Sequence, residues 1–373
     1  MDSHPKAIGL AIVAGARPNF MKVAPLIRSL KQDPDFHVTL IHTGQHYDDN
    51  MSGQIFRDLE IPPPDHNLEV GSGTHAQQTA EIMKRIEPIL RECSPRGVIV
   101  VGDVNSTVAG ALVAKKIGVE VIDVEAGLRS FDRAMPEEIN RIVTDSITDL
   151  FLVTEQSGVE NLRREGCDPQ RIYLVGNLMI DSLQKNLRKA RESDVCERIG
   201  VKRKNYGLVT LHRPANVDDR EAISDILRAL ATIAEELPLV WPMHPRVKAQ
   251  IVDSSLSLPA NIAVEEPLGY LDFLCLEANS VVVLTDSGGV QEETTALGIE
   301  CLTIRENTER PVTLEMGTNR LAGTKSSTIL AAWKAMHASS RGGICPPLWD
   351  GRAAERCHNV LRNYFSAKLK HSP

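Results

Sequence analysis

The sequence contains no apolar run long enough to cross a membrane, although 42% of its 373 residues are hydrophobic. The first apolar segment, at residues 8–13, is short, follows no basic leader and is broken by Gly15 and Pro18. These features are atypical of a signal peptide, and we interpret the segment as a first buried strand. We therefore expect a soluble globular protein with no membrane partner.

Several functional signatures are also missing. The seven cysteines form no C-x-x-C pair, which argues against a disulfide framework or a zinc ribbon and favours a cytoplasmic location. The net charge of −7 argues against a nucleic-acid partner, although local basic groups can still bind an anion. Neither a GxGxxG dinucleotide fingerprint nor an HExxH metal motif occurs, so we expect no cofactor and no metal.

The most informative segment is a strand–helix–strand pattern in the first half of the chain. Two β-branched runs, at residues 97–101 and 119–124, flank small and apolar residues at helical spacing, which predicts a unit of a parallel sheet. Asp103 follows the first run, Glu125 follows the second, and the acidic pair Glu137 and Glu138 follows Pro136 at a predicted helix start. Because ligands of parallel α/β sheets lie at the carboxyl ends of the strands, we expect these carboxylates to face one cleft. Three carboxylates in one cleft indicate proton-transfer chemistry.

Charged and polar residues also follow the earlier predicted strands. Arg17 and Lys22 lie around a predicted helix N-terminus, where backbone dipoles favour an anion. Two isolated cations are more often simply solvated, but their place after a strand favours a functional role. His46 and Tyr47 belong to a polar loop, and spacing alone leaves open whether they contact a ligand or cap the loop.

The βα pattern restarts near residue 206. A buried strand there leads into a turn of Ser287, Gly288 and Gly289 followed by a helix, so backbone amides can approach an anion closely at a helix N-terminus. This arrangement is typical of a diphosphate pocket. Glu293 follows about one helical turn later, within reach of ribose hydroxyls, although a surface charge on the helix explains it equally well. The two halves together predict two Rossmann-like α/β domains with parallel sheets that face a central cleft.

Nine segments in family order resemble the non-hydrolysing UDP-N-acetylglucosamine 2-epimerases, and the resemblance extends over nearly the whole chain. The segments are GARPNFMKVAPLI, TGQHYDDNMS, GDVNST, VEAGLRSFDRAMPEEINR, TLHRPANVD, MHPR, EPLGYLDF, TDSGGVQEE and NTERPVT. The resemblance implies the GT-B fold. It places an N-terminal Rossmann-like domain with the catalytic carboxylates at residues 1–185 and a UDP-binding Rossmann-like domain at residues 186–355. It also implies a C-terminal helix, residues 356–373, that packs back on the first domain, and a homodimer.

The resemblance further implies a mechanism for inverting carbon 2 of a UDP-linked sugar. The C2 proton leaves while UDP is expelled in an anti elimination, and UDP adds back to the 2-acetamidoglucal after reprotonation from the opposite face. Matching residues are catalytic Asp103, Glu125, Glu137 and His212, and substrate- or UDP-binding Arg17, Lys22, Arg141, Arg213, Phe273, Ser287, Gly288, Gly289, Glu293 and Arg310. Which carboxylate removes the proton is left open.

Two departures from the family pattern keep alternatives open. The loop TGQHYDDNM lacks the alanine and arginine of commoner members, which bears on activation by a second substrate molecule and on the sugar itself, for example a 2,3-diacetamido uronic acid. RPANVD stands where many members have RxENVD. The alternative functions are a hydrolysing 2-epimerase, a GT-B glycosyltransferase and a UDP-sugar sensor. Product analysis distinguishes the hydrolase, a requirement for an acceptor identifies the transferase, and UDP binding without turnover supports the sensor.

Overall fold

The computed structural model describes residues 7–44, 56–253, 258, 261–339 and 342–370. The chain folds into two compact units: unit 1 comprises Met1–Ser182 and Pro347–Pro373, and unit 2 comprises Leu183–Pro346. His46 and Tyr47 of the polar loop lie outside the described residues. Among the described residues, no helix is both long enough and apolar enough to span a membrane.

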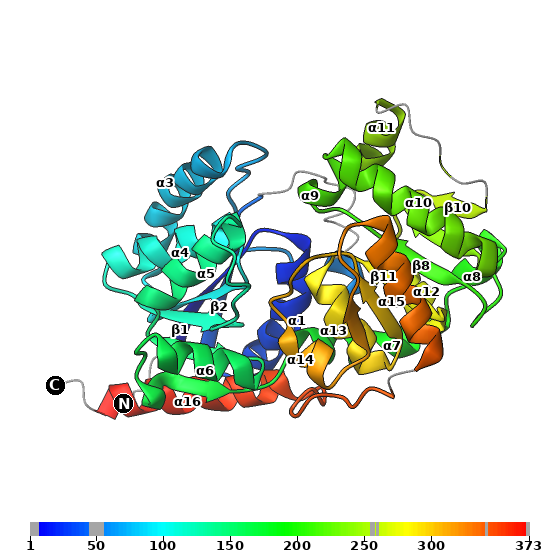
Figure 1. The fold of residues 1–373 in the computed structure, drawn as a ribbon. Coiled ribbons are helices and arrows are strands. Elements are labelled where there is room, and N and C mark those ends of the chain that lie inside the picture. Colours follow the sequence, from blue (N-terminus) through cyan, green and yellow to red (C-terminus); the bar gives the residue numbers. More distant parts are fainter. Residues whose placement is uncertain (1–6, 45–55, 254–257, 259–260, 340–341, 371–373) are drawn as a thin grey trace. The chain divides into compact units, whose positions relative to one another are not determined.

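Unit 1 is built on a sheet whose described strands are all parallel, in the order β3-β2-β1-β4-β5-β6-β7 (Figure 1). The strands are β1 (Ile8–Ala14), β2 (Phe36–His42), β3 (His66–Asn67), β4 (Gly97–Val101), β5 (Glu120–Val124), β6 (Leu150–Val153) and β7 (Ile172–Leu174). Each residue of β4 is buried, as expected for a strand covered on both faces of a parallel sheet. The predicted strand–helix–strand unit is confirmed.

Helices connect these strands and cover the sheet. They are α1 (Arg17–Lys31), α3 (His75–Cys93), α4 (Asn105–Lys116), α5 (Pro136–Ile147), α6 (Gln156–Arg164), the 3-10 helix η1 (Pro169–Arg171) and α16 (Ala353–Lys370). Helix α7 (Leu178–Arg191) begins in unit 1 and continues into unit 2, which starts at Leu183. The C-terminal α16, red in Figure 1, packs against α1 at the start of the chain. His358 joins the two helices, with Nε2 2.6 Å from Asp33 Oδ2 and Nδ1 2.8 Å from the Ser29 hydroxyl.

Unit 2 repeats the design with described strands that are also all parallel, in the order β10-β9-β8-β11-β12-β13. They are β8 (Gly207–Thr210), β9 (Leu239–Pro242), β10 (Ile262–Glu265), β11 (Val282–Thr285), β12 (Glu300–Thr303) and β13 (Asn319–Leu321). The helices are α8 (Val195–Ile199), α9 (Pro214–Val217), α10 (Arg220–Glu236), α11 (Pro245–Asp253), α12 (Tyr270–Asn279), α13 (Gly288–Leu297), α14 (Pro311–Glu315) and α15 (Ser326–Ala338). The predicted pair of parallel α/β sheets is thus confirmed.

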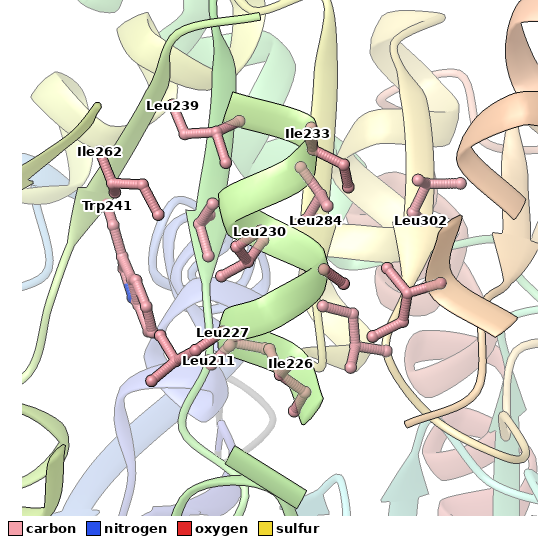
Figure 2. Close-up of a cluster of buried hydrophobic side chains, with 14 of the residues drawn as sticks. Leu211, Ile226, Leu227, Leu230, Ile233, Leu239, Trp241, Ile262, Leu284 and Leu302 are labelled. Atoms are coloured by element: carbon pink, nitrogen blue, oxygen red, sulfur yellow. The ribbon is translucent and has the colours of Figure 1, made fainter. Parts of the chain in front are cut away.

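Helix α10 shows how the sequence pattern builds the core of unit 2. Asp219 caps it by accepting hydrogen bonds from the backbone amides of Glu221 and Ala222, at 2.8 and 3.1 Å. Its apolar residues recur at helical spacing and point toward the sheet, where Trp241 of β9 is fully buried (Figure 2). Each fully buried leucine contributes about 1.5–3 kcal/mol to the stability of the fold, relative to an exposed leucine. The core therefore holds the ends of β8 and β11 in fixed positions.

One carboxyl group is buried within unit 2. Glu277 of α12 is fully buried, and neither carboxyl oxygen has a hydrogen-bond partner among the described residues. Burial, and to a smaller extent the negative charge of Glu293, raise the pKa of Glu277 well above its ordinary value. The side chain is therefore neutral in the folded protein under conditions in which the unfolded chain ionises.

This difference predicts a pH-dependent stability. Because the folded-state pKa is raised, the contribution of Glu277 to stability is present below the unfolded-state pKa and is lost as pH rises above it. We expect Glu277→Leu to raise the free energy of unfolding at pH 8 by about 1–3 kcal/mol, since it removes an unpartnered polar group, and to raise it less at pH 4. Denaturant unfolding at both pH values measures this, with the exposed Glu235→Leu as control. Equal gains at the two pH values would contradict the assignment.

Candidate active site

The carboxylates predicted at adjacent strand ends occupy those ends in unit 1. β4 and β5 pair in parallel with Val101 opposite Val124, so Asp103 and Glu125 both follow the same edge of the sheet. A Cβ built on Gly102 would lie 3.7 Å from Glu125 Oε2, which places this carboxylate beside the chain leading to Asp103. The structure therefore brings these two predicted residues to neighbouring positions.

Glu125 sits in an unusual environment. Its backbone has a φ of 76°, in the left-handed region that non-glycine residues rarely adopt, and its amide donates to the Leu152 carbonyl at 2.9 Å. Its side chain is almost fully buried and forms an ion pair with Lys22, itself buried, from α1. A strained backbone at a buried ion pair is typical of a functional position.

The N-terminus of α5 supplies the next group. Arg141 forms ion pairs with Asp103 and with Glu138, the latter at 2.7 Å. Glu137 is half-buried in the first turn of the helix, and among the described residues no hydrogen bond or ion pair engages its carboxylate. Asn140 anchors the same turn through a 2.9 Å hydrogen bond to the Asp103 carbonyl. Asp103 and Arg141 are thus ion-paired, and Glu137 lies four positions before Arg141 on α5, on the same side of the helix.

Glu138 differs from its neighbour in the sequence. It is fully buried and accepts hydrogen bonds at 2.9 Å from the amides of Ser130 and Phe131 and at 2.7 Å from Arg141. Burial alone would raise the pKa of Glu138, but the Ser130 amide and the Arg141 guanidinium hold it below its ordinary value. Glu138 is therefore ionised at neutral pH and anchors the backbone at Ser130 and Phe131, whereas the Glu137 carboxylate is unengaged among the described residues. Arg17 is the first residue of α1, and its side chain is not among those described.

Unit 2 places a histidine over a buried aspartate. His212 follows β8 and Asp286 follows β11, which lie side by side in the sheet. Asp286 is fully buried and accepts from His212 Nδ1 at 2.8 Å, from the His212 and Arg213 amides at 3.1 and 2.9 Å, and from Asn216 at 3.1 Å. Burial alone would raise the pKa of Asp286, but His212 and these amides hold it below its ordinary value. Since Asp286 takes Nδ1 as a donor, the exposed imidazole directs Nε2 outward.

The glycine turn predicted to hold a diphosphate lies beside these residues in sequence. Ser287 is the N-cap of α13, and Gly288 opens the helix. A Cβ at Gly288 would lie 2.7 Å from Glu309 Oε1, and Glu309 is fixed by Arg305 at 2.7 Å. A side chain at this position would therefore clash with a held carboxylate, so the turn requires glycine. Together with the half-buried Gly289, it leaves backbone amides at a helix N-terminus, the usual setting for phosphate.

The remaining predicted residues of unit 2 lie on α12, α13 and the segment before α14. Glu293 is buried and accepts a 3.3 Å hydrogen bond from the Tyr270 hydroxyl. Phe273 is half-buried on α12. Arg310 is buried and forms an ion pair with Glu292 at 2.6 Å. Glu293 is therefore not the surface charge that the sequence left open, and Arg310 is anchored by an adjacent carboxylate.

Sequence reasoning missed several residues that organise the site. Asp286 lies directly before the Ser-Gly-Gly turn. The available signal was its acidic side chain at the end of a buried strand, the position at which Asp103 and Glu125 were predicted as site residues. Asn216 donates to Asp286 and to the Ile304 carbonyl at 2.9 Å, and Glu309 supports the glycine turn. These contacts join segments separated by up to 88 positions, so spacing along the chain gives no sign of them.

Two Rossmann-like units with parallel sheets, each with charged or glycine-rich groups after its strands, define an α/β protein of the GT-B class. The model of the UDP-N-acetylglucosamine 2-epimerase family matches residues 28–362, and the chain belongs to that family of enzymes.

Individual relatives agree with this membership. The UDP-N-acetylglucosamine 2-epimerase of Methanocaldococcus jannaschii is 41% identical over 362 residues, which covers 94% of this chain and 98% of the relative. The UDP-2,3-diacetamido-2,3-dideoxy-D-glucuronate 2-epimerase of Pseudomonas aeruginosa is 38% identical over 322 residues, which covers 85% of this chain and 89% of the relative. The crystal structure of the M. jannaschii UDP-GlcNAc 2-epimerase in complex with UDP-GlcNAc and UDP superposes with a TM-score of 0.90 at 40% identity, covering 95% of this chain and all of that one.

Proposed function

We propose that this protein is a non-hydrolysing epimerase that interconverts UDP-N-acetylglucosamine and UDP-N-acetylmannosamine by inverting carbon 2. The observation that supports this most is the placement of Asp103 and Glu125 directly after the neighbouring strands β4 and β5, with Arg141 of the Glu137 helix ion-paired to Asp103. Inversion of a C–H centre needs a proton acceptor on one face and a proton donor on the other, and carboxyl groups in unequal surroundings supply both. The M. jannaschii relative is named for the same sugar nucleotide.

The reaction we propose proceeds by elimination and re-addition. One carboxylate of unit 1 removes the C2 proton while the C1–O bond to UDP breaks, so that a C1–C2 double bond forms and UDP departs with the bonding electrons. A second carboxyl group then protonates carbon 2 from the opposite face, and the UDP oxygen attacks carbon 1. Catalysis thus requires that UDP stays bound while it is detached from the sugar.

Unit 2 supplies groups suited to hold that UDP. We assign the diphosphate to the backbone amides at Ser287, Gly288 and Gly289, with His212 and Arg213 stabilising the charge that develops on the departing UDP. The Asp286 contact fixes the imidazole so that its outward nitrogen meets this charge without reorganisation.

The other binding residues have complementary roles in this proposal. Glu293 accepts from the ribose hydroxyls, Phe273 lies near the uracil, and Arg310 binds the diphosphate. Arg17 and Lys22 add positive charge on the unit 1 side, and Lys22 also pairs with Glu125. We infer no metal or organic cofactor in this mechanism, since proton transfer and charge stabilisation come from side chains and backbone amides.

A second substrate is favoured by a specific observation. The P. aeruginosa relative, at 38% identity, is named for a 2,3-diacetamido uronic acid, and the TGQHYDDNM loop departs from commoner family members. The same chemistry then applies to a sugar with a second acetamido group at carbon 3 and a carboxylate at carbon 6. A hydrolysing 2-epimerase shares the intermediate but delivers water rather than UDP to carbon 1.

Product analysis tests these possibilities together. We expect incubation with UDP-N-acetylglucosamine to give UDP-N-acetylmannosamine without net release of UDP, as followed by anion-exchange chromatography. Free N-acetylmannosamine with stoichiometric UDP would identify the hydrolase. A kcat/KM at least about tenfold higher for the diacetamido uronate than for UDP-N-acetylglucosamine would transfer the assignment to that sugar. A tenfold difference in kcat/KM corresponds to about 1.4 kcal/mol of transition-state binding.

Two further expectations concern the setting of the enzyme. We propose a cytoplasmic location, which the seven unpaired cysteines support because disulfides are rare in reducing compartments. We also propose a homodimer on the basis of family membership, and sedimentation equilibrium measures its mass directly.

A further inference from the structure

The segment that joins Glu125 to the helix of Glu137 is held in an improbable conformation. Three of its residues have left-handed backbones: Glu125 with φ 76°, Gly127 with φ 81° and Phe131 with φ 60°. A Cβ at Gly127 would lie 2.4 Å from the Gly158 carbonyl oxygen, so the chain passes close to its neighbour there. Such a conformation persists only where surrounding contacts impose it.

Two buried carboxylates of α5 supply those contacts. Glu138 accepts from the amides of Ser130 and Phe131 near the end of the segment. Further along α5, Asp145 accepts a hydrogen bond from the amide of Gly127 at 3.1 Å, near the beginning of the segment. Glu138 and Asp145 are seven positions apart, which places them on the same side of the helix. The helix that presents Glu137 therefore also holds the chain that leaves Glu125.

Arg129 strengthens the second of these contacts. Its guanidinium is buried and lies 2.6 Å from Asp145 and 2.6 Å from Glu165, with a further Nε bond of 2.8 Å to Glu165. It also donates to the Leu128 carbonyl at 2.8 Å. Asp145 is thus bound both to the backbone of the segment and to a side chain within it.

Asp123 of β5 is the third buried carboxylate beside this segment. It lies two residues before Glu125 on β5 and is buried against Asp145. Burial, together with the charges of Asp145 and Glu125, raises the pKa of Asp123 well above its ordinary value. Burial also raises the pKa of Asp145, but the Arg129 charge and the hydrogen bond from the Gly127 amide oppose that rise, so we assign the proton of the pair to Asp123. The two aspartates therefore have different tasks although they touch.

We propose that Asp145 is a positioning residue for the epimerisation, fixing the relative placement of Glu125 and Glu137 through the Gly127 amide and Arg129. The inference rests on the proposed function, because it assigns those two glutamates to catalysis. Loss of the carboxylate charge at Asp145 leaves the more exposed Glu165 as the remaining ion-pair partner of Arg129 among the described residues, and it weakens the acceptor for Gly127. Displacing catalytic groups by about 1 Å costs on the order of 10²-fold in rate without changing how the nucleotide binds.

A matched pair of variants tests this. Asp145→Asn removes the charged member, and Asp123→Asn replaces the protonated member with a neutral side chain that still donates to Asp145. We expect Asp145→Asn to lower kcat by about 10²-fold with KM for the UDP-sugar changed less than about threefold, and Asp123→Asn to keep kcat within about threefold of the parent. Equal kcat values for the two variants, or a KM effect as large as the kcat effect, would overturn the proposal.

Two controls keep the outcomes separate. Solvent deuterium exchange at carbon 2 by the unmodified protein is measured first, and its absence would refute the proposed function rather than the role of Asp145. Should Asp145→Asn fail to fold, Arg129→Lys shortens the side chain that joins Asp145 to the segment, keeps its positive charge and leaves both buried aspartates in place. We then expect kcat to fall several-fold with KM unchanged, and a kcat equal to that of the parent overturns the inference.

Discussion

Replacing Glu125 with glutamine lowers kcat for the epimerisation by about 10²–10⁴-fold while UDP affinity stays within a few-fold of the parent. This range is what a positioned acid or base contributes to a proton transfer. Glutamine keeps the shape of the side chain but neither holds a proton nor pairs with Lys22 as a carboxylate does. Steady-state kinetics with UDP-N-acetylglucosamine, together with calorimetric titration of UDP, measure both quantities.

The same strand provides the control for this substitution. Glu120 lies at the opposite end of β5, where its carboxylate accepts from the Tyr364 hydroxyl at 2.5 Å. We expect Glu120→Gln to leave kcat within about threefold of the parent, since its contacts concern α16 and not the strand ends. Should the two variants lose activity equally, the effect at Glu125 would be one of folding and not of catalysis.

Isotope exchange in Asp103→Asn and Glu137→Gln then separates the acid from the base. In deuterated water, a variant that lacks the acid can no longer protonate carbon 2 from the opposite face. Its base still removes the C2 proton and returns a deuteron to the same face, which gives deuterated starting material without epimerisation. A variant that lacks the base does neither. This comparison resolves the assignment that sequence left open.

Substitution of His212 with alanine lowers kcat by about 10²–10³-fold with little change in stability. The magnitude is that of removing one donor aimed at developing charge in a transition state. Stability is preserved because 59% of the imidazole is exposed, while the buried Asp286 keeps its hydrogen bonds from the His212 and Arg213 amides and from Asn216. Kinetics and thermal unfolding of the variant measure the two effects.

His337→Ala is the matched control, since His337 is an exposed histidine of the same unit that packs edge-on against Trp333. We expect full activity from it. A His212→Ala enzyme with normal kcat would remove His212 from the mechanism and leave charge stabilisation to the glycine turn and the arginines.

The strands and their terminal carboxylates were predictable from sequence because each parallel strand is buried on both faces. Continuous apolar runs such as residues 97–101 have few other interpretations, and the residue after such a run must emerge at one edge of the sheet. This argument predicts Asp103 and Glu125 without any family resemblance. The parallel sheets confirm the reasoning.

The distinction between neighbouring residues was not predictable in the same way. Glu137 and Glu138 have the same chemistry and adjacent positions, yet one is half-buried and unengaged among the described residues while the other is buried under four hydrogen-bond donor groups. Only the path of the segment before α5 decides which carboxylate faces inward. Sequence alone selected Glu137 through the resemblance and not through physical argument.

The buried aspartates and their partners were also not predictable, because their contacts depend on tertiary structure. Asp286, Asp123 and Asp145 each lie within or beside an apolar pattern, where a carboxylate is expected to be excluded from the interior. Their partners, among them His212 and Arg129, come from distant parts of the chain. Such groups are recognised only once the tertiary contacts that neutralise them are known.

Proton NMR of UDP-N-acetylglucosamine incubated with the enzyme in deuterated water tests the central claim most directly. The account predicts a manno-configured UDP-sugar that has deuterium at carbon 2, because the proton removed by one carboxylate is replaced from solvent through another. A manno product that retains its original C2 hydrogen, or a substrate that stays unchanged and undeuterated, would contradict it.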